Sequence, residues 1–143
     1  MTDYDNIAYL NFIQGTISRM SANSALMKGF AATFMSVMLG MCVTETVNLC
    51  YLILAFVPVL SFIYFDVYYL QMEKRYRNLY ALVADLNNRA FNYTLDLNSE
   101  LLDDYKTRIY KDSKFWKVLW SISVWRFYIL FIVAFSIIII LIA

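Results

Sequence analysis

Histidine is absent from this chain of 143 residues, only 16% of its positions are charged, and it has two cysteines and one proline. Soluble domains carry about 25% charged residues. Without histidine, and without clustered cysteines or carboxylates inside an apolar run, the sequence offers neither a metal-ligand set nor an activated catalytic group. We therefore expect a protein that is not an enzyme and holds no cofactor. A net charge of +1 also gives no general attraction to nucleic acid.

Three long runs without any charge dominate the sequence: residues 29–44, 46–65 and 127–143, with 16, 20 and 17 residues. At about 1.5 Å per residue, a helix of this length is suited to a hydrocarbon core of roughly 30 Å. Only Glu45 separates the first two runs, so they should form a tight hairpin. The sequence therefore predicts an all-α membrane protein with three transmembrane helices: a hairpin over 29–66, with spans 29–45 and 46–66, and a third helix over 118–143.

The basic residues are sorted along the chain in a way that predicts its orientation. Arg19 and Lys28 precede the first span, the link between the first two spans has none, and the segment 67–117 holds nine. The positive-inside rule then places residues 1–28 and 67–117 in the cytoplasm and the C-terminus outside. We expect a multi-pass protein of the inner membrane, with the lipid bilayer as its first partner.

Helical patterns continue on the cytoplasmic side of the first span. Apolar side chains recur every three or four positions from Ile7 to Met27, which predicts an amphipathic N-terminal helix over 1–28. This helix should lie on the membrane surface or pack on the cytoplasmic segment. Within the first span, small residues at Ala32, Ser36 and Gly40 form a face that allows another helix to approach closely.

The second span is predicted to continue past the membrane as one helix from about residue 47 to 90, roughly 65 Å long. Beyond Asp66 it carries an apolar stripe that steps by three and four: Tyr69, Met72, Tyr76, Leu79, Val83 and Leu86. Such a stripe needs a partner. The partner could be the N-terminal helix, a helix over 100–117, or the same stripe of another subunit.

Residues 91–98 change to a two-residue period, with Phe91, Tyr93, Leu95 and Leu97 alternating with polar residues. The sequence has no second run of this kind, so a strand here would pair with a copy of itself, pack as an extended segment, or belong to a helix. These four residues and the stripe above are our candidate contacts in a homo-oligomer. A helix is expected from Ser99 toward Trp116, and Trp116, Trp120 and Trp125 should anchor the inner interface.

The hairpin brings charges to the same depth. If the tip lies near residues 46–47, Lys28 faces Asp66, and Arg19 faces Glu73 when the N-terminal helix is collinear with the first span. Arg126 lies 17 residues from the outer end of the third span and should share the level of Lys28 and Asp66. We interpret these five residues as inner-interface charge pairs that fix helix register; a charged constriction in a pore is the alternative.

Motifs in the same regions resemble a family of small bacterial membrane proteins, the RipA-family octameric membrane proteins. The similar motifs are Ile17-x-Arg19-Met20-x-x-Asn23-Ser24-x-x-x-Lys28, then Pro58, Phe62 and Asp66-x-Tyr68-Tyr69-Leu70-x-x-Glu73-x-x-Tyr76-Arg77-x-Leu79-Tyr80, and Trp120-Ser121 to Phe127-Tyr128. Residues 91–117 match only in general character. The resemblance implies a bacterial cytoplasmic-membrane protein that forms a homo-octamer, in a family linked to survival of intracellular pathogens within host cells.

We expect a homo-oligomeric membrane assembly whose cytoplasmic helices act as a scaffold or a sensor, supporting stress resistance or intracellular survival. Two alternatives stay open. One is an oligomeric pore or membrane-disrupting effector, as in phage defence, and the other is an accessory subunit of a larger membrane complex. The nearly wholly apolar run 127–143 disfavours a constitutive pore. The sequence defines no small-molecule ligand.

Overall fold

The structure, a computed structural model, describes residues 3–42, 49–85 and 94–142, and every regular element in these ranges is helical. The expectation of an all-α chain is therefore confirmed for the described residues. The elements in order are α1 (Asp3–Cys42), α2 (Leu49–Asp85), the 3₁₀ helix η1 (Glu100–Tyr105), α3 (Lys106–Ile109), α4 (Phe115–Leu119) and α5 (Ile122–Ile142).

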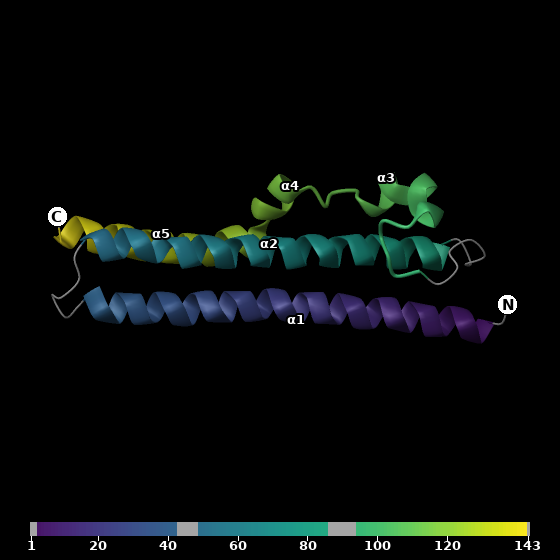
Figure 1. Cartoon of the computed structure of the whole chain (residues 1–143), viewed down its shortest axis with the longest axis horizontal. Coiled ribbons are helices and arrows are strands. Elements are labelled where there is room, and N and C mark those ends of the chain that lie inside the picture. The colour runs from purple at the N-terminus through teal and green to yellow at the C-terminus, as the bar shows by residue number, and fades with distance from the viewer. Residues whose placement is uncertain (1–2, 43–48, 86–93, 143) are drawn as a thin grey trace.

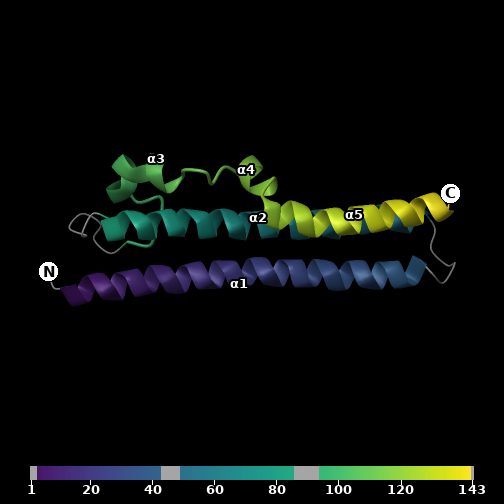
Figure 2. The same cartoon turned by 180° about the vertical axis from the view of Figure 1, so that it is seen from behind.

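Two long antiparallel helices form the frame of the molecule. α1 has 40 residues and α2 has 37, so each is about 55–60 Å long. They lie side by side along their lengths in both views, with α5 along one half of the pair and the segment from η1 to α4 along the other half (Figures 1 and 2). The expected amphipathic helix and the first span are thus one uninterrupted helix. α2 likewise runs from the expected second span into the predicted projection, and passes through Pro58 without ending.

Apolar side chains between the helices gather in separate cores. The first core joins the N-terminal half of α1, the C-terminal half of α2 and the segment 94–110, and its buried residues are Tyr9, Ile13, Ile17, Leu79, Leu82, Val83, Leu97, Leu102 and Ile109. The second core, where α5 meets the long helices, buries Ala31, Val67, Val118, Val124 and Tyr128. Further toward the hairpin tip, Met35 packs with Val59. Each half of the hairpin is therefore covered by a different part of the chain.

The apolar stripe of α2 finds its partners within the chain. Leu79 and Val83 are buried in the first core, and Met72, Tyr76 and Leu95 pack against it. Of the three partners considered, the N-terminal helix and the segment after residue 100 both cover the stripe. Leu79, Val83 and Leu97 are thus buried within the chain, whereas Met72, Tyr76 and Leu95 are half-buried. Tyr69 is also half-buried, and its ring packs edge-on against Tyr68. A role of these residues in contact with another subunit stays a prediction. Leu86, Phe91 and Tyr93 lie outside the described residues.

The expected strand is not present in the part of 91–98 that the structure describes. Residues 94–98 form an irregular segment and a turn. Local hydrogen bonds explain this, because the Asp96 N–H donates to Thr94 Oγ1 (3.1 Å) and the Asn98 N–H donates to Asp96 Oδ1 (2.9 Å). Short polar side chains that bond the nearby backbone favour turns over strands. Leu97 is nevertheless buried in the first core, and Leu95 packs against that core. The alternating apolar residues therefore mark an irregular segment that is buried on one side.

The expected helix from Ser99 to Trp116 is broken into three pieces. η1 and α3 end at Ile109, a turn follows over Tyr110–Asp112, and α4 begins at Phe115. Asp112 has a positive φ of 58°, a left-handed conformation that interrupts a helix. A further turn at Trp120 and Ser121 separates α4 from α5, so the third helix begins at Ile122 and not at residue 118.

Within the part of the chain that the structure describes, most of the small-residue face of α1 is left uncovered. Ser36 and Gly40 are exposed, a side chain at Gly40 would meet open space, and Ala32 is only half-buried. The face that packs against α2 and α5 instead includes Ala31 and Met35, which are almost fully buried. The close approach of another helix to Ala32, Ser36 and Gly40 therefore stays a prediction, and the helix concerned would belong to another copy of the chain.

One described helix is long and apolar enough to cross a membrane. This stretch of α1, Ile7–Met41, has 35 residues, and α5 contains a shorter apolar stretch, Ile122–Ala134. Residues 43–48, which include the expected hairpin tip, lie outside the described residues. The structure therefore supports association with a membrane through at least one apolar helix.

Truncation of Leu79 tests the first core. Leu79→Ala removes a side chain with no exposed surface, so the free energy of unfolding should fall by roughly 2–5 kcal/mol. Leu60→Ala on the same helix is the control, since Leu60 is 62% exposed and should change the free energy by less than about 0.5 kcal/mol. Denaturation in detergent, followed by circular dichroism, measures both. Equal losses would contradict the assignment of the core.

Candidate functional site

An ion pair lies between α1 and α2 at the border of their apolar halves. Lys28 Nζ is 2.6 Å from Asp66 Oδ1. The Asp66 side chain has no exposed surface, and the Lys28 side chain retains 18%. Lys28 is the last charged residue of α1, and Asp66 is the first described charged residue of α2. The predicted pairing of Lys28 with Asp66 is confirmed, and it follows from the hairpin register.

Ser24 completes the contact from α1. Its hydroxyl donates to Asp66 Oδ1 (2.5 Å) and accepts a hydrogen bond from Lys28 Nζ (3.1 Å). Ser24 and Lys28 are four positions apart, so they lie on the same face of the helix. Two polar side chains of α1 thus converge on one carboxylate oxygen of Asp66 inside an apolar bundle.

Tyr128 reaches the same place from α5. Its buried hydroxyl lies close to the Asp66 carboxylate, yet neither Tyr128 Oη nor Asp66 Oδ2 makes a hydrogen bond. Tyr128 is also part of the second core, so the ring is fixed by packing on α1, α2 and α4. We call Ser24, Lys28, Asp66 and Tyr128 the boundary cluster. It joins all three long helices.

The burial of the boundary cluster decides how it acts. A charge pair taken out of water gains little net stability, but removal of one partner leaves an uncompensated charge and costs about 3–5 kcal/mol. The cluster therefore restricts the register of α1 against α2 more than it adds to overall stability. A slip of one helical turn would bury Asp66 without Lys28.

The other three predicted charges do not join this cluster. Arg19 donates to Thr16 Oγ1 of its own helix (3.3 Å), and Glu73 pairs with Arg77 Nη2 at 2.7 Å. The predicted pair Arg19–Glu73 is thus not formed, because Arg77 lies one turn from Glu73 on the same helix and reaches it first. Arg126 is exposed and contacts neither Lys28 nor Asp66. Tyr128, two residues further along α5, lies close to the Asp66 carboxylate, so Arg126 lies within about 3 Å of the predicted level along the helix.

Side-chain amides of α2 hold the broken segment between α3 and α4. Asn78 Nδ2 donates to the carbonyls of Ile109 and Lys111, both at 2.9 Å, and Gln71 Nε2 donates to the carbonyl of Ser113 (2.7 Å). The Arg75 guanidinium lies 4.4 Å from the centre of the Tyr110 ring. Carbonyls at a helix end lack hydrogen-bond partners in their own helix. The amides of Asn78 and Gln71 provide these carbonyls with partners where the helix is broken.

Tyrosine hydroxyls hold the segment after residue 93 in a similar way. Tyr9 Oη donates to the carbonyl of Thr94 (2.5 Å), and Tyr76 Oη donates to the carbonyl of Leu95 (3.1 Å). Burial, and then the nearby charge of Asp96, raises the pKa of Tyr76, which keeps its hydroxyl protonated and able to donate. The backbone carbonyls of Thr94 and Leu95, which have no strand partner, thus accept hydrogen bonds from these two side chains.

The three tryptophans lie where the segment joins α5. Trp116 and Trp120 are 71% and 66% exposed, and the Trp120 and Trp125 rings are 5.0 Å apart. All three precede the boundary-cluster residue Tyr128, in or next to α4 and at the start of α5. Among the described residues, no group of three or more histidine, cysteine, aspartate or glutamate side chains is arranged to hold a metal ion.

Sequence reasoning missed Ser24 and Tyr128 as cluster members, and Asn78 and Gln71 as clamps. Ser24 carried a usable signal, because it occupies a core-facing position one turn from Lys28. Tyr128 had only a weak one, as a single hydroxyl near the start of an apolar run. The amides of Asn78 and Gln71 gave none, since polar residues on a long helix usually face solvent.

A charge exchange tests the boundary cluster. Lys28→Asp places two carboxylates together and should lower the free energy of unfolding by about 3–5 kcal/mol. Adding Asp66→Lys restores opposite charges and should recover part of the loss in detergent denaturation. Lys106→Asp, at the exposed pair with Asp103, is the control and should have a much smaller effect. If the double variant is no more stable than Lys28→Asp, the pairing does not fix the register.

Comparison of the chain with protein-family models, with curated proteins and with solved structures found no match. The resemblance to RipA-family proteins therefore stays a prediction from sequence motifs.

Proposed function

We propose that the chain is a three-span protein of a bacterial inner membrane that assembles with copies of itself and acts as a non-enzymatic scaffold or sensor. Residues 1–28 and 67–117 face the cytoplasm in this proposal, and the C-terminus lies outside. The boundary cluster is the observation that carries it. On one side of the cluster, residues 29–42, 49–65 and 127–142 of the three helices carry no charge.

The dimensions of the helices support this arrangement. α5 has 21 residues and is about 32 Å long, close to the roughly 30 Å of a hydrocarbon core. It lies along only the half of the hairpin that contains the end of α1 and the start of α2 (Figure 1). The exposed side chains in this half are largely apolar, as lipid contact requires; they include Phe30, Val37, Leu60, Leu130, Val133 and Ile137.

The polar side chains in this half favour a lipid-facing bundle over a pore. The hydroxyls of Thr33, Ser61 and Ser136 each donate to the carbonyl four positions earlier in their own helix, at 3.0, 3.2 and 2.7 Å. Lys28 and Asp66 neutralise one another. The three hydroxyls are satisfied without water, and the ion pair carries no net charge, so these groups do not call for an aqueous path.

Self-assembly is supported by apolar side chains in the other half of α1. Ile7 and Phe12 are 58% and 66% exposed. Phe12 lies 16 residues before Lys28, which is about 24 Å along the helix from the boundary cluster. At that distance no lipid covers it in the proposed topology. A second copy of the chain is the partner that we propose for these exposed side chains.

Cysteine labelling tests the topology. Cys42 and Cys50 are replaced by serine, and single cysteines are introduced by Thr107→Cys, an exposed position, or appended after Ala143. In spheroplasts, a membrane-impermeant maleimide should label only the appended cysteine, and after permeabilisation it should label both. Labelling of Thr107→Cys before permeabilisation would overturn the proposed orientation, and protection of both sites before permeabilisation would overturn the odd number of spans.

A mass measurement in mild detergent tests self-assembly. The wild-type chain of 16.8 kDa should give a particle of several copies without a second component. Phe12→Glu should shift the mass toward a single chain, because it places a charge in the proposed contact. Asn11→Glu is the matched control at the neighbouring exposed position and should keep the assembly. A monomeric wild type, or a particle that needs another protein, would contradict the scaffold.

A further inference from the structure

The surface around α4 combines basic and aromatic side chains. Trp116, Lys117 and Trp120 are spaced by one, three and four positions, so they share one face of this short helix and its terminal turn, and all are exposed. Lys114 and Arg126, just before α4 and near the start of α5, are also exposed. We call these five residues the basic aromatic surface. It lies at the border that the boundary cluster marks.

Positive charge on this surface is not balanced by the chain itself. Between Tyr110 and Ala143 there are four basic residues, Lys111, Lys114, Lys117 and Arg126, against one acidic residue, Asp112. Asp112 pairs with Lys117 at 2.6 Å. Within the described part of the chain, Lys114 and Arg126 have no ion-pair partner. The surface therefore favours an anionic partner.

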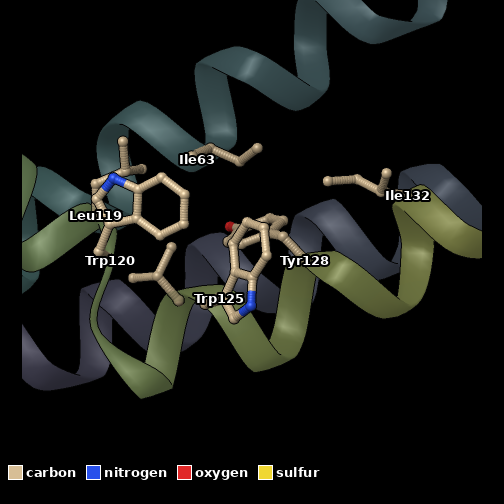
Figure 3. A pocket seen from close by; sticks show the side chains of 7 residues that line it. Ile63, Leu119, Trp120, Trp125, Tyr128 and Ile132 are labelled. Atoms are coloured by element: carbon tan, nitrogen blue, oxygen red, sulfur yellow. The ribbon is translucent and has the colours of Figure 1, made fainter.

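An apolar cavity opens beside Trp120, and Trp125 also lines it. Its volume is about 140 Å³, and its lining presents no polar surface. An engineered apolar cavity of about 150 Å³ binds benzene, so this one has room for a stretch of hydrocarbon. Figure 3 shows the Trp120 ring at one end, Ile132 at the other, and the Trp125 ring between them. The wall residues labelled there are Ile63, Leu119, Trp120, Trp125, Tyr128 and Ile132.

We propose that this place binds one anionic phospholipid of the inner leaflet, with an acyl chain in the cavity and its phosphate against the basic aromatic surface. The inference rests on the three-span topology proposed above. Tryptophan rings favour the level of the lipid headgroups. Basic pockets on the cytoplasmic side of a membrane protein bind acidic headgroups. Here both features adjoin a cavity that accepts only apolar atoms.

The protein's own fluorescence measures this site. The chain has three tryptophans, and all lie in 116–125. The full chain is reconstituted in phosphatidylcholine vesicles containing phosphatidylglycerol, with bromine on the acyl chains of one lipid or the other. Bromine quenches tryptophan only at short range. Since each basic group near an anionic membrane surface contributes about fivefold in affinity, brominated phosphatidylglycerol should quench with an apparent preference of at least about fivefold over brominated phosphatidylcholine.

Two sets of variants identify the groups responsible. Lys114→Gln combined with Arg126→Gln should remove most of the preference for phosphatidylglycerol. Lys106→Gln combined with Arg108→Gln removes the same net charge at the far end of the segment and should keep the preference. Ile132→Phe narrows the cavity at an exposed wall position, so it should reduce quenching by brominated phosphatidylglycerol and leave quenching by brominated phosphatidylcholine unchanged.

The outcomes separate this inference from the topology on which it rests. Equal quenching by the two lipids in the wild type would agree with tryptophans in the bilayer but would overturn the selective lipid site. So would a preference that survives loss of Lys114 and Arg126. Quenching by neither lipid would place the tryptophans away from the bilayer, and would overturn the membrane arrangement and the lipid site together.

Discussion

A single buried carboxylate governs how the long helices of this protein meet. Asp66 has no exposed surface, and its only described ionic partner is Lys28 of the facing helix. Because an unpaired charge in such a place is far more costly than a lost apolar contact, the two helices have one favourable register. Ser24 adds a hydrogen bond from the same face of α1. Tyr128 brings α5 to the same level.

The two halves of the hairpin are covered by different parts of the chain through different kinds of contact. Toward the tip, α5 covers α1 and α2 through apolar packing, with Met35, Val59 and Phe131 in contact. Away from the tip, a segment of short helices and turns covers them, and polar side chains of the long helices bond its backbone. The first solution suits a setting without water, and the second suits a surface in contact with it.

The features that sequence reasoning anticipated are those with strong periodicity. The length of α2, the inward stripe of Leu79 and Val83, and the pairing of Lys28 with Asp66 all follow from spacing along helices in a hairpin. The failures arise from local chemistry. The alternation before Asn98 predicted a strand, but Thr94 and Asp96 bond the nearby backbone and form a turn. The break at Asp112 depends on amides from α2 that lie more than 30 positions away in sequence. On α1, Ala31 is buried whereas its neighbour Ala32 is only half-buried, because one step along a helix moves a side chain about 100° around its axis.

The amide contacts of Asn78 and Gln71 have a mechanical consequence. They tie the backbone of residues 109–113 to α2 at three carbonyls, and α4 is joined to α5 by a turn of only two residues, Trp120 and Ser121. A displacement of α3 is therefore not absorbed by a flexible linker. It is transmitted to α2 through the amide hydrogen bonds and to α5 through the short turn. A partner that binds and displaces α3 would therefore also displace α2 and α5.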